Sequence, residues 1–223
     1  MIQINNVTKR YGKKTVVNNI SFEVKEGTLF GLLGANGAGK STTIKIILGL
    51  VQKDSGEVII KEGKTIGYSP ETPYFPPFMD GREVLKYYGE LQGIDKKDLK
   101  DECEKLLSLV GLEADDTKVK RYSKGMLQRL ALAQALLGDP DILILDEPCA
   151  GLDAMGRIEM LALIEKLKAK GKTIIMNSHI LNDMEKVLDE GIIMKNGNIL
   201  RKFDKEDITP EQSLENIFVN TVG

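Results

Sequence analysis

The chain has 223 residues, of which 42% are hydrophobic and 29% charged, a balance that suits a globular protein with one sizeable core. Lys and Arg number 31 and Asp and Glu 33, and this even balance, without a basic tail, argues against a nucleic-acid-binding protein. Apolar runs such as residues 44–51 fall far short of the ~20 residues that a membrane-spanning helix needs. The chain starts without the apolar core of a signal peptide and has only two cysteines, so we expect a reducing cytoplasm.

The first part of the chain predicts strands around a glycine-rich loop. Residues 2–7 and 19–24 alternate apolar and polar side chains, which is typical of half-buried antiparallel strands. Residues 28–34 are apolar on both faces, as in a strand that helices cover on both sides. The glycine-rich residues 34–40 follow, and residues 41–50 carry a helical apolar pattern. Strand, loop and helix in this order open a parallel α/β sheet.

The rest of the chain predicts a group of helices and then a return to the α/β core. Behind a proline-rich loop at residues 70–78, helices are expected at residues 81–93, 95–111 with Asp95 as N-cap, and 123–138, which ends at a glycine. Other expected elements are strands at 56–60, 64–68, 142–148 and 173–178, a helix that ends at Gly171, a hairpin turned at Asn196–Gly197, and a last helix begun by Thr209–Pro210.

The glycine-rich loop fits the pattern G-x-x-x-x-G-K-S, which cradles phosphate groups. Its backbone N–H groups are expected to bind phosphate oxygens, together with the positive end of the following helix; the residues concerned are Asn36, Gly37, Ala38 and Gly39. Lys40 is expected to reach the β- and γ-phosphates, Ser41 to bind Mg²⁺, and Thr42 to add a hydrogen bond to phosphate. The pattern therefore predicts a P-loop nucleotide-binding core.

Two carboxylates follow the apolar residues 142–145, at the edge of the sheet where open α/β folds bind their ligands. Asp146 is expected to hold Mg²⁺ through water. Glu147 is suited to polarise the water that attacks the γ-phosphate, which makes it the expected catalytic base. Together with the phosphate loop, this pair predicts nucleotide hydrolysis.

The motifs and their order resemble those of the nucleotide-binding subunit of ATP-binding cassette (ABC) transporters, and the resemblance covers about residues 1–200. The resemblance implies that Tyr11 stacks on the adenine of ATP and that Val16 packs nearby. Because stacking tolerates any base, this part of the site should discriminate poorly among nucleotides.

Residues 122–126, Tyr-Ser-Lys-Gly-Met, resemble the signature motif of that family, usually L-S-G-G-Q, with three departures. Ser123 is a good N-cap, and Gly125 lets a helix N-terminus approach an anion. The resemblance implies that Ser123 and Gly125 face the γ-phosphate bound by a second subunit, and that Asp153 contacts that subunit.

Two further residues gain a role from the resemblance. His179, the single histidine, follows the strand at 173–178 and resembles the switch histidine that contacts the γ-phosphate. Glu71 stands where the family usually has Gln, a residue that touches Mg²⁺ and the attacking water. We therefore expect Glu71 to act beside Glu147 and His179 in catalysis and beside Ser41 and Asp146 at the metal.

The expected fold is a single ABC ATPase domain over residues 1–223, of the α/β class. Residues 1–70 and 138–223 are expected to form a P-loop NTPase core, a mostly parallel sheet flanked by helices, with an antiparallel β subdomain. Residues 71–137 are expected to form an inserted α-helical lobe that carries the signature motif.

The expected function is ATP hydrolysis, with ATP and Mg²⁺ as cofactors, that drives transport through a separate transmembrane permease subunit. That subunit is expected to dock on the helical lobe around residues 72–83, so the chain would lie peripherally on the inner face of the cell membrane. Two chains, identical or homologous, are expected to pair head to tail around ATP.

Export is favoured over import by the Glu71 loop and the 122–126 motif, which are similar to those of exporters. The alternative is a non-transport ABC ATPase that acts on ribosomes or DNA. A single cassette, a short helical insert and the lack of a basic tail argue against that alternative. A P-loop kinase would leave the signature motif and His179 unexplained.

Overall fold

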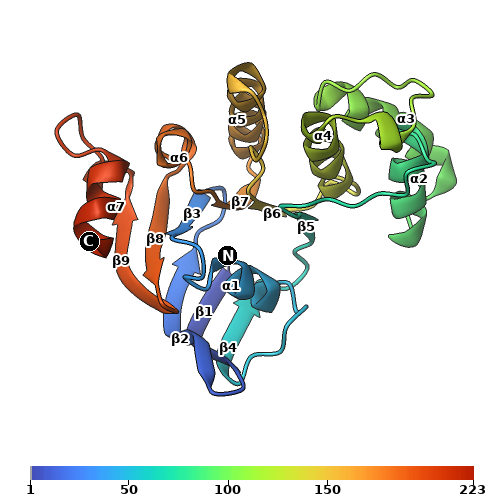
Figure 1. Cartoon of the computed structure of the whole chain (residues 1–223). Coiled ribbons are helices and arrows are strands. Elements are labelled where there is room, and N and C mark those ends of the chain that lie inside the picture. Colours follow the sequence, from blue (N-terminus) through green and yellow to red (C-terminus); the bar gives the residue numbers. More distant parts are fainter. Residues whose placement is uncertain (1) are drawn as a thin grey trace. The chain divides into compact units, whose positions relative to one another are not determined.

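The computed structural model describes residues 2–223, whose contacts divide the chain into two compact units (Figure 1). The first unit comprises the residues up to Lys64 together with Lys168–Gly223, and the second comprises Thr65–Leu167. None of the helices formed by residues 2–223 is long and apolar enough to cross a membrane.

An antiparallel sheet in the first unit is built from β1 (Ile2–Tyr11), β2 (Lys14–Val24) and β4 (Ser55–Ile60), in the order β2-β1-β4. Alternate residues of β1 such as Ile2 and Ile4 are buried, as the sequence pattern predicts. The register between β1 and β2 shifts between Ile4 and Val7, where Asn6 adopts a φ of 51°. This bulge explains why the apolar alternation breaks in the middle of β1.

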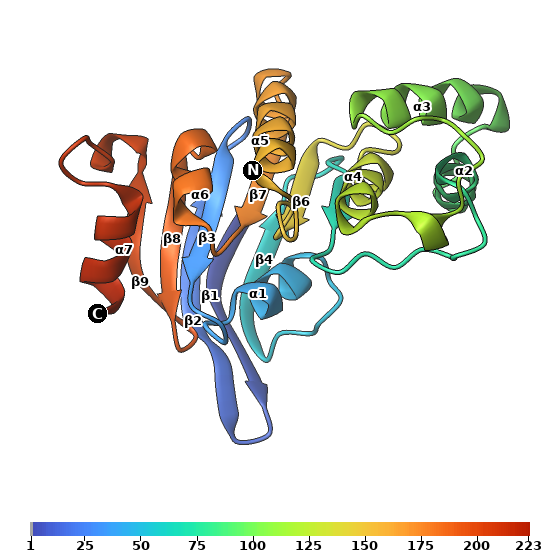
Figure 2. The same cartoon turned by 45° about the horizontal axis from the view of Figure 1, so that its top comes forward.

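The first unit also holds a mostly parallel sheet. In it, β3 (Leu29–Gly34) lies between β7 (Thr173–Asn177) and β8 (Glu190–Lys195), parallel to both, while β9 (Asn198–Asp204) runs antiparallel to β8 (Figure 2). Every residue of β3 and β7 is buried, because both faces of these strands are covered. The parallel core predicted from these apolar runs is confirmed.

Three helices belong to the first unit: α1 (Lys40–Ile47), α6 (Leu181–Val187) and α7 (Leu214–Val222), of which α7 packs on α6, β8 and β9. A short 3-10 turn, Lys205–Asp207, precedes α7. The predicted start of this last helix was wrong: Ser213 caps α7 by accepting a hydrogen bond from the Asn216 N–H, at 3.2 Å. Thr209 instead exchanges two backbone hydrogen bonds with Gln212 and closes a tight turn.

The second unit combines a parallel strand pair with helices. Its strands are β5 (Ile66–Ser69) and β6 (Ile142–Asp146), and its helices are α2 (Gly81–Leu91), α3 (Lys96–Leu109), α4 (Lys124–Ala135) and all but the last two residues of α5 (Ala154–Ala169), with a 3-10 turn at Val119–Arg121. Helices α2, α3 and α4 pack together into one group (Figure 2). Each of the three begins at a side-chain cap, from Asp80, Asp95 and Ser123.

Candidate functional site

The phosphate loop connects the end of β3 at Gly34 to the start of α1 at Lys40. Gly39, the N-cap of α1, has a φ of 108° and offers no side chain to cap the helix, so the first N–H groups of α1 are left for a ligand. A Cβ on Gly39 would lie 2.6 Å from the Val16 carbonyl oxygen, and one on Gly34 would lie 2.5 Å from the Met194 carbonyl oxygen. Only glycine fits at these two positions.

Lys40 is largely buried, although it is charged. Its ammonium folds back over the loop and donates hydrogen bonds to the carbonyl oxygens of Gly34, at 2.6 Å, and Ala35, at 3.3 Å. Val16 and residues 36–42 together line a hollow of about 150 Å³. The structure thus brings Val16, the loop N–H groups and the Lys40 side chain to one small cradle suited to an anion.

His179 lies at the same edge of the parallel sheet as the phosphate loop. Its strand, β7, ends at Asn177, which pairs with Leu32 of β3, two residues before Gly34. The side chain of His179 is exposed. Because parallel strands direct their carboxyl ends to one edge, His179 and the phosphate loop share the edge at which such sheets bind ligands.

Tyr11 ends β1, and its side chain is about half exposed. The Lys9 ammonium lies 5.3 Å from the centre of the Tyr11 ring, a cation–π contact that orients the ring. An exposed, oriented aromatic ring is suited to stacking on a nucleobase.

In the second unit, Asp146 is the last residue of β6 and is 5% exposed. The hydroxyl of Tyr68, on the neighbouring strand β5, hydrogen-bonds to its side chain. Burial, with the nearby Asp146 carboxylate, raises the pKa of Tyr68 to about 12, so this hydroxyl keeps its proton at neutral pH. The sequence did not single out Tyr68, whose pairing with β6 depends on tertiary structure.

Glu147 follows directly and is buried, with a φ of 52°. This left-handed conformation is rare for a residue other than glycine and costs about 1–3 kcal/mol. The Glu147 carbonyl accepts a hydrogen bond from the Ala150 N–H, at 2.9 Å, which closes the turn after β6. Such strain concentrates at functional sites, and it fixes the backbone of Glu147 in one direction.

Glu71 lies in the loop after β5, with an exposed side chain. Its backbone carbonyl accepts a hydrogen bond from the side-chain amide of Gln128, at 2.8 Å, and Gln128 is almost fully buried in α4. Gln128 was not predicted from the sequence, although an amide on the apolar side of a helix is a signal that could have indicated it.

Ser123, Gly125 and Asp153 come together in the second unit. The Ser123 hydroxyl accepts a hydrogen bond from the Met126 N–H, at 3.2 Å, and a Cβ on Gly125 would lie 2.9 Å from the side chain of Leu152. Asp153 accepts from the Gly156 N–H, at 2.7 Å. All three residues line one hollow of about 470 Å³ at the start of α4.

The residues expected to hold a metal ion are oxygen donors. Among residues 2–223, no three His, Cys, Asp or Glu side chains gather closely enough to hold one. The candidates are the exposed Ser41 in the first unit and the carboxylates of Asp146 and Glu71 in the second. Hydroxyl and carboxylate oxygens are the donors that Mg²⁺ prefers, and Mg²⁺ needs only one or two carboxylates when phosphates complete its shell. Each of these side chains, taken by itself, is thus an oxygen donor of the kind that suits Mg²⁺.

Proteins of similar sequence are described as ATP-binding proteins of ABC transporters or of transport. The family described as "ABC transporter" matches residues 17–150. An uncharacterized ABC transporter ATP-binding protein of Bacillus subtilis is 40% identical over 228 residues, covering all of this chain and 77% of the relative. A lantibiotic transport ATP-binding protein of Streptococcus pyogenes is 36% identical over 231 residues, covering all of this chain and 97% of the relative.

Two solved structures share the fold. One, an ATP-binding subunit of an ABC transporter, superimposes with a TM-score of 0.89 at 29% identity, over the whole of both chains. The other is a dimeric ATP-binding cassette in a post-hydrolysis state bound to ADP and Pi, with a TM-score of 0.84 at 25% identity, over 92% of this chain and 99% of that one.

Proposed function

The chain belongs to the ABC transporter family as an ATP-binding, ATP-hydrolysing subunit, and we propose that its phosphate loop, Asp146 and Glu147 carry out the reaction. The phosphate loop is the observation that carries this assignment most directly. A buried ammonium, a row of glycine-rich backbone N–H groups and an uncapped helix start converge on one hollow. In a site that excludes water, these groups attract a triphosphate far more strongly than they would in bulk solvent.

In the proposed reaction, Lys40 and the N–H groups of residues 36–42 hold the β- and γ-phosphates. Ser41, Asp146 and Glu71 would hold Mg²⁺, which when bound would neutralise charge on the phosphate oxygens. Glu147 polarises the attacking water, and its strained backbone keeps the carboxylate in place. His179 contacts the γ-phosphate from the shared edge of the sheet.

Tyr11 stacks on the adenine in this proposal, and Val16 packs beside it. Ser123 and Gly125, at the start of α4, face the γ-phosphate bound to a second cassette chain, and Asp153 contacts that chain. The hollow that these three residues share and the dimeric cassette of similar fold support a head-to-tail pair.

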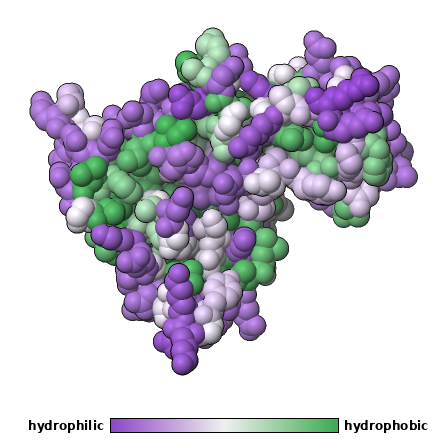
Figure 3. Space-filling model, in the orientation of Figure 1, coloured by the Kyte–Doolittle hydropathy of each residue, from purple (hydrophilic) through white to green (hydrophobic). Residues whose placement is uncertain are grey.

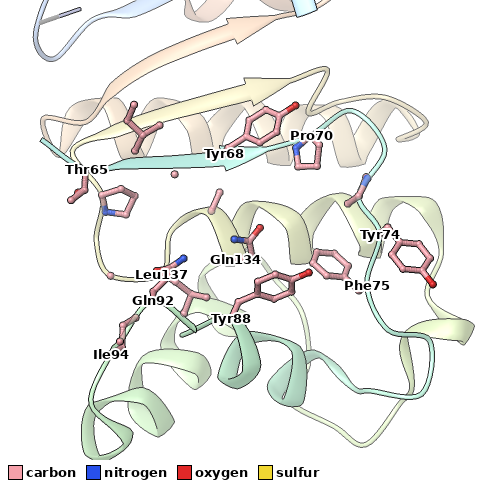
Figure 4. A pocket seen from close by; sticks show the side chains of 17 residues that line it. Thr65, Tyr68, Pro70, Tyr74, Phe75, Tyr88, Gln92, Ile94, Gln134 and Leu137 are labelled. Atoms are coloured by element: carbon pink, nitrogen blue, oxygen red, sulfur yellow. The ribbon is translucent and has the colours of Figure 1, made fainter. Parts of the chain in front are cut away.

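We further propose that residues 71–137 act as the helical lobe of one ATPase domain and dock a transmembrane subunit, with the chain peripheral on the inner face of the membrane. A cavity of about 810 Å³ lies under the loop after β5, and side chains such as Phe75, Tyr88 and Gln134 surround it (Figure 4). Nearby, Tyr74 and Phe78 are 81% and 69% exposed. On the face drawn in Figure 3, green apolar atoms emerge over the helices of the second unit. The lantibiotic transport relative supports export as the direction.

Replacing Lys40 by Ala tests the proposal. ATP affinity should fall at least about a hundredfold, because the phosphates lose their main cation in a shielded site. Lys45→Ala is the matched control: Lys45 belongs to the same helix but is exposed, so its removal should leave affinity within about twofold. Equal affinity of the two variants, measured by calorimetry with Mg²⁺-ATP, would refute the assignment of the loop.

A further inference from the structure

A hairpin turn far along the chain touches the phosphate loop. Strands β8 and β9 are joined by Asn196 and Gly197, whose φ values of 50° and 80° make a tight turn. The Gly197 N–H donates a hydrogen bond to the Ala38 carbonyl oxygen, at 2.9 Å. The Gly197 carbonyl accepts a hydrogen bond from the Asn18 N–H of β2, at 2.8 Å. One residue therefore bridges the phosphate loop and β2 through both of its backbone groups.

No side chain fits at this bridge. A Cβ on Gly197 would lie 2.6 Å from the Val16 carbonyl oxygen and 2.9 Å from the Val16 carbonyl carbon. The same Val16 oxygen lies 2.6 Å from the position of a Cβ on Gly39. Because the crowding atoms belong to backbone, they cannot yield as a flexible side chain would. The hairpin turn, β2 and the phosphate loop thus meet backbone to backbone.

The bridge also fixes the orientation of the peptide bond between Ala38 and Gly39. In a planar trans peptide, the C=O of one residue and the N–H of the next point in opposite directions. With the Ala38 C=O held toward Gly197, the Gly39 N–H points away from the hairpin turn. Gly39 lines the hollow of the phosphate loop.

We infer that Gly197 is a positioning residue for ATP: it aims the Gly39 N–H at the triphosphate and holds the phosphate loop in register with Val16. The inference rests on the proposed function, since it takes this hollow as the triphosphate site. The side chains of Asn18 and Asn198 reinforce the same bridge, with the Asn18 amide donating to the Asn198 carbonyl oxygen at 2.9 Å. Preorganisation of this kind lets a loop bind without first ordering itself.

The test is Gly197→Ala, with Gly171→Ala as the matched control. Gly171 also has a positive φ, of 89°, but an added Cβ would meet no atom within 4 Å. Both variants therefore carry the same kind of backbone strain, and only one disturbs the phosphate loop. ATP affinity is measured at a temperature where circular dichroism shows all the proteins folded. Gly197→Ala should bind ATP about tenfold more weakly than wild type, and Gly171→Ala within about twofold.

A spectroscopic readout separates positioning from loss of stability. In ¹⁵N-labelled wild-type protein and in Gly171→Ala, the Gly39 amide resonance should shift strongly when ATP is added, because that N–H acquires a phosphate acceptor. In Gly197→Ala the shift should be much smaller. Should Gly197→Ala fail to fold, Asn198→Ala replaces it. This variant removes the acceptor for Asn18 and a hydrogen bond to the Asn196 carbonyl oxygen, keeps glycine in the turn and should weaken ATP binding about threefold.

Two results have separate meanings. If the wild-type chain does not bind ATP, the proposed function is wrong. If the wild type binds ATP but the Gly197→Ala or, where that variant is unfolded, the Asn198→Ala protein binds it equally well with the same Gly39 shift, the positioning role of Gly197 is overturned and the proposed function stands.

Discussion

At the scale of single residues, His179 and Lys40 are expected to act at different stages. Lys40 lies against the phosphate loop and is proposed to serve binding, whereas His179 is exposed beyond the end of β7. His179→Ala should therefore keep ATP affinity within about twofold and lower kcat about a hundredfold, because a contact made mainly in the transition state changes turnover rather than binding. Calorimetry and steady-state phosphate release measure the two quantities. Turnover at the wild-type level would leave His179 with a structural role.

Replacing Glu71 tests whether its departure from the Gln that is usual in the family affects hydrolysis. Gln128 holds the backbone carbonyl of Glu71, not its carboxylate, so a change of side chain should leave the loop in place. Gln has the same reach as Glu but lacks its negative charge. We expect Glu71→Gln to retain hydrolysis or to raise it by up to about threefold, since one repulsive charge near the phosphates is lost. Complete loss of phosphate release would show that the carboxylate itself takes part in the reaction.

At the scale of elements, Asp80 caps and stabilises the start of α2. Its carboxylate accepts hydrogen bonds from the Glu83 N–H and from Lys118, both at 2.9 Å, and Glu83 accepts the Asp80 N–H in return. Asp80→Ala should lower the free energy of unfolding by about 2 kcal/mol, because it removes a cap and leaves Lys118 without a buried acceptor. Asp95→Ala removes an exposed cap from α3 and should lower the free energy of unfolding by only about 1 kcal/mol. Urea denaturation compares the two, and equal losses would show that the Lys118 contact adds nothing.

The contribution of Asp80 to the free energy of unfolding should also depend on pH. Burial raises the pKa of Asp80, but the Glu83 N–H and Lys118 outweigh burial and hold the pKa below its ordinary value. A lowered folded-state pKa means that the carboxylate stabilises the fold above its ordinary pKa and ceases to do so as the pH falls through the folded value. The difference in the free energy of unfolding between wild type and Asp80→Ala should therefore shrink as the pH falls, which urea denaturation at a series of acid pH values would show.

The sequence predicted these elements where local signals agreed. The Asp95 and Ser123 caps and the positive φ of Asn196 and Gly197 follow from local chemistry and were confirmed. The start of α7 was mispredicted because two local signals competed, and the cap at Ser213 prevailed over Pro210.

Tertiary contacts could not be predicted in this way. The bond between Gln128 and Glu71 joins residues 57 positions apart, and the hairpin turn reaches Ala38 across most of the chain. Neither contact leaves a periodic trace in the sequence. The motifs therefore predicted the candidate site residues, whereas the groups that hold them in place emerged only from the fold.

At the scale of the whole molecule, the proposed ATP site needs residues from two chains. Ser123 and Gly125 line a hollow at the start of α4, and the phosphate loop lines another. In the proposed head-to-tail pair, the first hollow of one chain closes over ATP held by the second hollow of its partner. ATP thereby becomes part of the interface, and its hydrolysis weakens the pair.

Light scattering of the Glu147→Gln variant, with and without ATP, tests this central claim most directly. The variant keeps the binding charges of the phosphate loop but lacks the proposed base, so ATP persists and the pair should accumulate. We predict monomers without nucleotide and dimers with ATP, while Glu147→Gln combined with Ser123→Arg should bind ATP and stay monomeric because the arginine fills the hollow at α4. A Glu147→Gln protein that binds ATP yet remains monomeric at tens of micromolar would contradict the account of two identical chains closing on ATP.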